Sequence, residues 1–308
     1  MPSWNQLLAE LEGHQQDPAA ANNWLKYAQI QWIDSLSQVR GGRHVIFYAS
    51  GFLQKPHAAP FFLQINPEDI NGFMSAMHGM DWSKGLTLLL HTPGGITNAT
   101  ETIVEYLHQK FTDIEVIIPA YAMSAGTMIS LASNRLIMGR QSQLGPIDPQ
   151  MPLGGRSASA RAIVDQFDQA KSEIIQDVRT AAVWAPALQT LGPALLREAK
   201  DALHYGEEMV ARWLAKRHFH HRPDAVIKSA AVANYFNRSE NHKSHGRRID
   251  RDEARAQGLD VTDLEIDQNL QDIVLTNYHL ATLAFEKTPC VKFILSNTGN
   301  IWVKNMNF

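Results

Sequence analysis

Short apolar runs alternate with helical segments through the middle of this 308-residue chain, and this alternation constrains the fold most strongly. Residues 86–91, 114–119 and 135–138 are strand-length and almost continuously apolar, as in LTLLL and IEVII. Segments with helical spacing, at 97–111 and from about 124 to 133, separate them. Strands that are apolar on both faces belong to a sheet covered by helices on both sides. The pattern predicts an α/β fold with right-handed crossovers between parallel strands.

Further elements are expected on both sides of this core. Two helices are predicted between residues 3 and 38, and a strand at 44–48. A helix is expected to begin at Asn66, where the sequence NPED offers a cap, a proline for the first turn and acidic residues near the positive end of the helix dipole.

The C-terminal half is predicted to be mainly helical. Helical patterns cover residues 157–217 and continue at 224–236, 250–258 and 265–286. Two strand-length runs then flank the sequence SNTGN at 296–300, which predicts a C-terminal hairpin.

Composition excludes several classes of protein. The chain is 44% hydrophobic and 19% charged, as soluble globular proteins are. It has 28 basic and 31 acidic residues, so it lacks the basic excess of a nucleic-acid-binding protein. Cys290 is its single cysteine, which excludes an internal disulfide and suits a reducing compartment. Without a signal peptide pattern or a run approaching about 18 apolar residues, we expect a cytoplasmic protein with no membrane span.

Two short segments that follow neighbouring strands carry the chemistry. Residues 91–95 (HTPGG) place a Gly-Gly turn, with open backbone N–H groups, at the end of a strand. Residues 122–127 (AMSAGT) place Ser124 at a strand-to-helix junction between small residues. A nucleophilic hydroxyl and a backbone that binds an oxyanion are the two parts that acyl transfer most needs.

A serine in this position more often only caps the following helix. Its combination with a Gly-Gly turn at this spacing favours a serine hydrolase site. In that site Ser124 is the nucleophile and the N–H of Ala125 is one oxyanion donor. Gly94 or Gly95 supplies the second donor.

Three motifs in order closely resemble the serine dehydrogenase proteinase family, whose relatives include signal peptide peptidase A and the Clp proteolytic subunit. They are HTPGG at 91–95, AMSAGT at 122–127 and LGPIDPQ at 144–150. The resemblance covers about residues 44–265. Ala125 stands where family members often have glycine, which we regard as a mild difference.

The resemblance implies an α/β fold of the ClpP/crotonase type, a β-β-α spiral with an N-terminal helical extension and a C-terminal β-hairpin. The corresponding parts are residues 1–40, 41–288 and 289–308. It also implies an ATP-independent serine endopeptidase that acts on peptides or proteins and assembles into a homo-oligomer. No nucleic acid is expected as a partner, and neither a metal nor an organic cofactor is implied.

The resemblance also directs the search for a general base. In Clp subunits a histidine follows the serine closely, but residues 147–150 of this chain contain none. In the signal peptide peptidase relatives the general base is a lysine farther along the chain. Lys171 lies 47 positions after Ser124, with no other lysine between Lys110 and Lys200. Most lysines are solvated, whereas a general base must be neutral and therefore desolvated. A Ser124–Lys171 dyad is the preferred prediction, with Gly95 as oxyanion donor and Gly94 shaping the turn.

Several auxiliary residues keep open roles. His245, or His242 beside it, is the alternative base, although a surface histidine in a basic loop is the commoner situation. Asp148 could bind either Lys171 or His245, or only order its own loop. His91 is expected to support the Gly-Gly turn.

The sequence also contains weaker signals, and other classes of function are alternatives to a serine peptidase. The histidines at 218, 220 and 221 lack a second ligand group at a spacing that suits zinc. The basic run at 247–251 is expected to be a solvated loop. The same fold also accommodates crotonase-type acyl-CoA enzymes, and a non-catalytic oligomeric scaffold is the third alternative.

Overall fold

A computed structural model describes residues 2–14, 17–189, 191–192, 194–238 and 242–306. The chain forms two compact units, one made of Met1–Leu144 with Arg248–Phe308 and the other of Gly145–Arg247. The division into residues 1–40, 41–288 and 289–308 stays a prediction, because compactness alone does not test it. No described helix is long and apolar enough to cross a bilayer.

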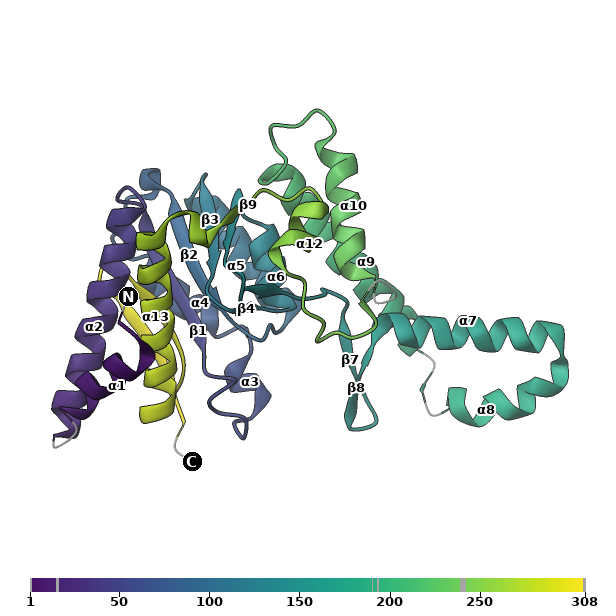
Figure 1. Ribbon diagram of the computed structural model, residues 1–308. Helices are drawn as coiled ribbons and strands as arrows, with labels where there is room; N and C mark the ends of the chain where they lie inside the picture. The colour runs from purple at the N-terminus through teal and green to yellow at the C-terminus, as the bar shows by residue number, and fades with distance from the viewer. Residues whose placement is uncertain (1, 15–16, 190, 193, 239–241, 307–308) are drawn as a thin grey trace. The chain divides into compact units, whose positions relative to one another are not determined.

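A seven-stranded sheet forms the centre of the first unit, with the order β11-β10-β1-β2-β3-β5-β9 (Figure 1). Strands β1, β2, β3, β5 and β9 are parallel, whereas β10 is antiparallel to both β1 and β11. The strand bounds are His44–Ser50 (β1), Leu86–His91 (β2), Ile114–Ile118 (β3), Arg135–Met138 (β5), Val261–Asp263 (β9), Cys290–Ser296 (β10) and Ile301–Asn305 (β11).

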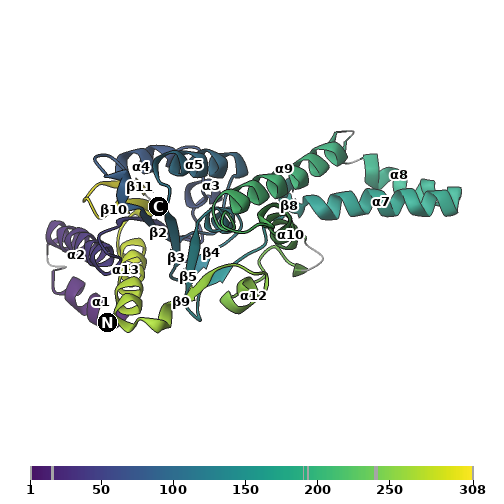
Figure 2. The ribbon, with the colours of Figure 1, turned by 90° about the horizontal axis from the view of Figure 1, so that it is seen from above.

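Helices cover both faces of this sheet, as its apolar strands require (Figure 2). One face carries α1 (Trp4–Glu12), α2 (Pro18–Val39) and α13 (Gln268–Lys287); the other carries α3 (Pro60–Leu63), α4 (Asp69–Ala76) and α5 (Thr97–Lys110). The core under α2 and α13 includes Leu36, Phe47, Leu89, Phe285 and Phe293. The first unit also contains η1 (Trp82–Lys84), β4 (Tyr121–Ala122), α6 (Ala125–Leu131), β6 (Gln143–Leu144), α12 (Arg251–Ala256) and η3 (Leu264–Ile266).

The structure confirms the predicted mixed α/β architecture around a mostly parallel sheet. One helix start was wrong: α4 begins at Asp69, because the Asn66 side chain accepts the Glu68 N–H (2.9 Å) in a turn that precedes the helix. Strands β10 and β11 pair where the hairpin was expected, and β10 also joins the central sheet through β1. The β-β-α spiral stays a prediction.

The second unit is mainly helical. Its elements are β7 (Gln150–Leu153), β8 (Arg156–Ser159), α7 (Ala160–Gln176), η2 (Val178–Thr180), α8 (Ala181–Gln189), α9 (Leu195–Lys216) and α10 (Ala225–Asn237). The helical pattern predicted from residue 157 was wrong for its first residues, which pair with β7 as strand β8. Gly154 and Gly155, both with positive φ, form the tight turn between these strands. Helix α7 packs against α9 through Ile163, Val164, Ala199 and Leu203.

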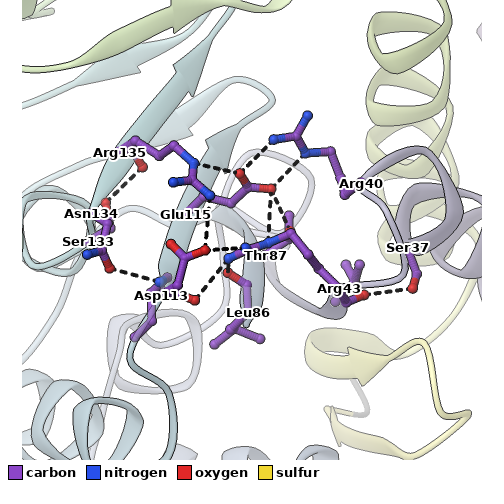
Figure 3. A network of polar contacts seen from close by, with 12 residues as sticks. Ser37, Arg40, Arg43, Leu86, Thr87, Asp113, Glu115, Ser133, Asn134 and Arg135 are labelled. Carbon is purple, nitrogen blue, oxygen red and sulfur yellow. Dashed lines mark hydrogen bonds and ion pairs between the residues drawn. The ribbon is translucent and has the colours of Figure 1, made fainter. Parts of the chain in front are cut away.

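A buried carboxylate joins the amino-terminal ends of three parallel strands (Figure 3). Glu115 of β3, whose side chain is 0% exposed, accepts hydrogen bonds from Arg40 (2.7 and 2.8 Å), Thr87 (2.7 Å) and Arg135 (3.1 Å). Burial opposes its ionisation. The hydrogen bonds from Arg40 and Thr87 and the charges of Arg40 and Arg43 outweigh that penalty, and they lower the pKa of Glu115 to about 2. The ion-pair network therefore ties β2, β3 and β5 together opposite their carboxyl ends.

Replacing Glu115 is expected to lower stability in a pH-dependent way. A carboxylate whose folded pKa is depressed stabilises the fold above its ordinary pKa, 4.5, and this contribution is lost as pH falls towards about 2. We expect Glu115→Gln to lower the free energy of unfolding by about 3 kcal/mol near pH 7, and the deficit to shrink below pH 4.5. Urea unfolding at several pH values measures this.

Asp113→Asn is the matched control for this network. Asp113 contacts Arg43 and Arg135, but its side chain is 42% exposed, so its loss is expected to cost below about 1 kcal/mol. A Glu115→Gln deficit that stays constant from pH 7 to pH 3 would contradict the assigned role of the Glu115 charge.

Candidate active site

Ser124 occupies a strained turn between a strand and a helix. It follows β4 and directly precedes α6, with φ 49° and ψ −112°. A positive φ is uncommon outside glycine and costs about 1–3 kcal/mol, so it persists where the surrounding structure enforces it. The Ser124 side chain makes no capping hydrogen bond to α6, and the residue is half-buried. The simple helix-cap reading is therefore wrong, and the hydroxyl is not sealed in the core.

Backbone pairing beyond the end of β2 brings the Gly-Gly turn to this serine. The Thr92 N–H donates to the Tyr121 carbonyl (2.9 Å), and the Met123 N–H donates to the Thr92 carbonyl (3.1 Å). Gly94 then lies so close that a Cβ added to it would be 2.7 Å from Ser124 Cβ. Its φ of +106° also requires glycine. The two segments singled out in the sequence thus meet in one place.

Two backbone N–H groups remain available beside Ser124. The Gly94 N–H donates to Thr92 Oγ1 (3.2 Å), while the Gly94 carbonyl accepts from Ile65 N–H (2.8 Å). Across a trans peptide the C=O and N–H point in opposite directions, so the Gly95 N–H points away from Ile65. Among the described residues, no backbone hydrogen bond is donated by Gly95 or by Ala125. Both N–H groups can therefore serve as donors at the junction.

His91, which was predicted to support this turn, is a buried residue at the end of β2. Its ring is fully buried among the rings of Phe52, Tyr121 and Tyr278, with centroid distances of 5.1, 5.9 and 4.9 Å. Burial lowers the pKa of His91 to about 3, so the imidazole is neutral over the physiological range. Both ring nitrogens lack a hydrogen-bond partner in the described part of the chain. His91 therefore packs as an uncharged ring, and its support of the turn stays a prediction.

Lys171 lies in the second unit, on α7, and is exposed. The buried residues of this helix are Ala160, Ile163, Val164 and Ala170. The structure of this unit by itself therefore does not supply the desolvation that a neutral lysine base requires.

Asp148 and His245 form a pair within the second unit. His245 Nδ1 lies 2.8 Å from Asp148 Oδ1, and Gln150 Nε2 donates to Asp148 Oδ2 (2.8 Å). Asp148 is 2% exposed, whereas the His245 side chain is 29% exposed. Of the two partners left open for Asp148 by the sequence, the structure shows His245. A buried carboxylate that binds Nδ1 orients the imidazole, an arrangement that acyl-transfer enzymes use for a histidine base.

Sequence reasoning missed the residues that hold the Gly-Gly turn from its other side. Ile65 pairs with the turn, and Tyr48, Asp69 and Lys292 lie buried behind it. Only Lys292 gave a signal, as a charged residue inside the apolar run VKFIL. Among the described residues, no three His, Cys, Asp or Glu side chains gather as metal ligands.

Comparison with known proteins places the chain in a class that matches this geometry. Residues 18–227 match the family model of ClpP-like SDH-type serine proteinases. This match spans more than half of the chain, which therefore belongs to that family of serine proteinases.

Individual relatives are more distant. An uncharacterized protein of Methanocaldococcus jannaschii, MJ0137, is 28% identical over 235 residues, which are 76% of this chain and 72% of the relative. A second uncharacterized protein of that organism, MJ1495, is 37% identical over 92 residues, 30% of this chain and 32% of its own. A mutant of the membrane-bound stomatin-specific protease 1510-N is 18% identical at a TM-score of 0.37, covering 64% of this chain and 74% of that one.

Proposed function

We propose that this protein is an ATP-independent serine endopeptidase in which Ser124 is the nucleophile. The observation that carries the proposal is the strained Ser124 turn, with an uncapped side chain and two free N–H groups beside it. Membership in a serine proteinase family supports the same chemistry. Cytoplasmic location and a homo-oligomer stay predictions.

In the proposed reaction, Ser124 Oγ attacks the carbonyl carbon of the scissile peptide bond. The negative charge that develops on the carbonyl oxygen is bound by the N–H groups of Ala125 and Gly95, while Gly94 shapes the turn. Lys171 accepts the hydroxyl proton and then protonates the leaving amine, which produces an acyl-enzyme. Water hydrolyses this ester with the same base. Because Lys171 is exposed, this scheme requires the lysine to be desolvated when substrate is bound.

The Asp148–His245 pair is the second candidate base, favoured by its geometry. The 2.8 Å contact to a buried carboxylate orients the imidazole, as the carboxylate of a Ser-His-Asp triad does. Both candidates belong to the second unit, whereas Ser124 belongs to the first.

Two substitutions are expected to separate the candidate bases. If Lys171 is the base, Lys171→Ala lowers kcat for casein cleavage by about 10²–10⁴-fold, and His245→Ala stays within a few-fold of wild type. Lys200→Ala is the matched control, because Lys200 is also an exposed helical lysine of the second unit. Initial rates at equal concentrations of folded enzyme measure the effect.

The opposite result identifies the histidine. Full activity in Lys171→Ala with an inactive His245→Ala would exclude the Ser124–Lys171 dyad. In that case Asp148→Asn should also be impaired, since the imidazole loses its orienting carboxylate.

The alternative functions make different predictions for the same protein. A crotonase-type enzyme would be stabilised by coenzyme A in thermal unfolding, and its activity would not need Ser124. A non-catalytic scaffold would assemble normally and would not react with a fluorophosphonate probe. The free Gly95 and Ala125 N–H groups suit either acyl chemistry, but only a peptidase accounts for the uncapped Ser124 hydroxyl.

A further inference from the structure

An ion pair is fully buried in the first unit, behind the Gly-Gly turn. Lys292 of β10 is 1% exposed and Asp69 of α4 is 0% exposed, with Nζ 2.6 Å from Oδ1. The Tyr48 hydroxyl donates to Asp69 Oδ2 (2.8 Å). Lysine and aspartate are rarely this deeply buried, because removing both charges from water costs more than their attraction usually returns. Stability alone is a weak reason for such a pair, so a positioning role is the better explanation.

The pair tethers the backbone on both sides of Ile65. Lys292 Nζ donates to the Gln64 carbonyl (2.9 Å), and the Asn66 N–H donates to Asp69 Oδ2 (3.1 Å). Burial raises the pKa of Asp69 and lowers that of Lys292, and their mutual attraction offsets part of each shift. The segment carrying Ile65 is thus fixed by charged groups that have no access to water.

Ile65 is bound to the Gly-Gly turn by backbone hydrogen bonds. Its N–H donates to the Gly94 carbonyl (2.8 Å), and its carbonyl accepts the Ile96 N–H (2.8 Å). A Cβ added to Gly95 would lie 2.2 Å from the Ile65 carbonyl oxygen, so the two backbones are in direct contact. Since the Gly94 carbonyl is held towards Ile65, the N–H on the same peptide unit, that of Gly95, is held in the opposite direction.

A second connection runs through Tyr48. Thr92 lies near the Tyr48 hydroxyl, where it offsets part of the effect of burial on the Tyr48 pKa. Thr92 Oγ1 also accepts the Gly94 N–H (3.2 Å). The buried cluster is therefore connected to Gly94 through Ile65, and it lies near the turn at Thr92.

We propose that Lys292, Asp69 and Tyr48 are positioning residues, which hold the Gly94–Gly95 peptide so that the Gly95 N–H is directed at the developing oxyanion. This inference rests on the proposed peptidase function and assigns the cluster a role within it. A preorganised donor stabilises the transition state more than the bound substrate, so the cluster should act on kcat more than on KM.

Two variants test the role, so that the test survives if one of them fails to fold. Lys292→Met alone would leave the Asp69 carboxylate buried and unpaired, so Lys292→Met combined with Asp69→Leu removes both charges together. Tyr48→Phe removes a single hydroxyl. Lys304→Met is the matched control: Lys304 is the cross-strand neighbour of Lys292, but it is 27% exposed and pairs with Glu68 (2.8 Å).

Kinetics with a casein-derived peptide give the first readout, with active enzyme counted by fluorophosphonate titration. We expect the double variant to lower kcat by about 10²-fold and Tyr48→Phe by about tenfold, with KM within about threefold of wild type. Binding of a peptide boronate, which places an oxygen where the oxyanion forms, should weaken by the same factor as kcat. Lys304→Met should match wild type. A rise in KM as large as the fall in kcat, or an unchanged kcat in the double variant, would overturn the positioning role.

Amide hydrogen exchange gives a readout that needs no activity. The Ile65 and Ile96 amides should exchange at least about tenfold faster in the double variant than in Lys304→Met, whereas amides of β3 should not change. If wild type neither cleaves peptides nor reacts with the probe, the proposed function fails. Hydrogen exchange alone then tests whether the buried cluster holds Ile65 against the Gly-Gly turn. Unchanged exchange at Ile65 and Ile96 would overturn the inference even in an active peptidase.

Discussion

Ser124→Ala is expected to abolish peptidase activity while leaving the fold intact. Removing a nucleophilic serine lowers kcat by as much as about 10⁶-fold in serine proteases, because the covalent route is lost. Alanine tolerates the φ of 49° about as well as serine does, and the Ser124 side chain makes no capping bond that would be lost. The midpoint of thermal unfolding should therefore change by no more than about 2 °C. Casein cleavage and circular dichroism measure the two effects.

Ser75→Ala is the control for this substitution. Ser75 is an exposed serine on α4 in the same unit, so its removal should change neither activity nor unfolding. Peptidase activity of Ser124→Ala above about one-hundredth of wild type, after exclusion of a contaminating protease, would show that another group is the nucleophile.

Gly94→Ala is expected to have the second-largest effect. A methyl group there would lie 2.7 Å from Ser124 Cβ and 2.8 Å from the Met123 carbonyl oxygen, at a φ of +106° that alanine rarely adopts. The turn must shift away from the serine, which misplaces the Gly95 N–H. Loss of one oxyanion donor costs about 10²–10³-fold in kcat, so a loss of at least that size is expected. Backbone strain should also lower the free energy of unfolding by about 1–3 kcal/mol.

Gly79→Ala separates these two consequences. Gly79 also has a positive φ, +76°, but nothing lies within 4 Å of the position that its Cβ would take. It should cost stability by the same backbone mechanism and leave kcat unchanged. If Gly94→Ala and Gly79→Ala lowered kcat equally, the close approach of Gly94 to Ser124 would have no catalytic meaning.

Local sequence patterns predicted the central sheet and the meeting of the two site segments. The continuous apolar runs of β2, β3 and β5 signal strands covered on both faces, and the structure confirms them. Ser124 could be proposed as the nucleophile because the signal lies in the residues next to it in the chain. The short hairpin β7–β8 was missed, because α7 begins directly after β8 and the helical pattern extends into that strand.

The unpredicted parts depend on contacts between distant segments. His245 contacts Asp148 across 97 positions, and Lys292 contacts the Gln64 carbonyl across 228. Neither contact can be predicted from local periodicity, because it depends on how segments far apart in the sequence are arranged in the fold. The exposure of Lys171 is a similar case, because the sequence of α7 does not reveal which part of the helix is covered by α9.

Covalent labelling tests most directly whether Ser124 is the nucleophile. The protein is incubated with a fluorophosphonate probe, digested and mapped by mass spectrometry. We expect one adduct per active chain, on the peptide that contains Ser124, and no adduct in Ser124→Ala. An adduct on a different serine, or an unlabelled Ser124 in a preparation that cleaves casein, would contradict the proposed site.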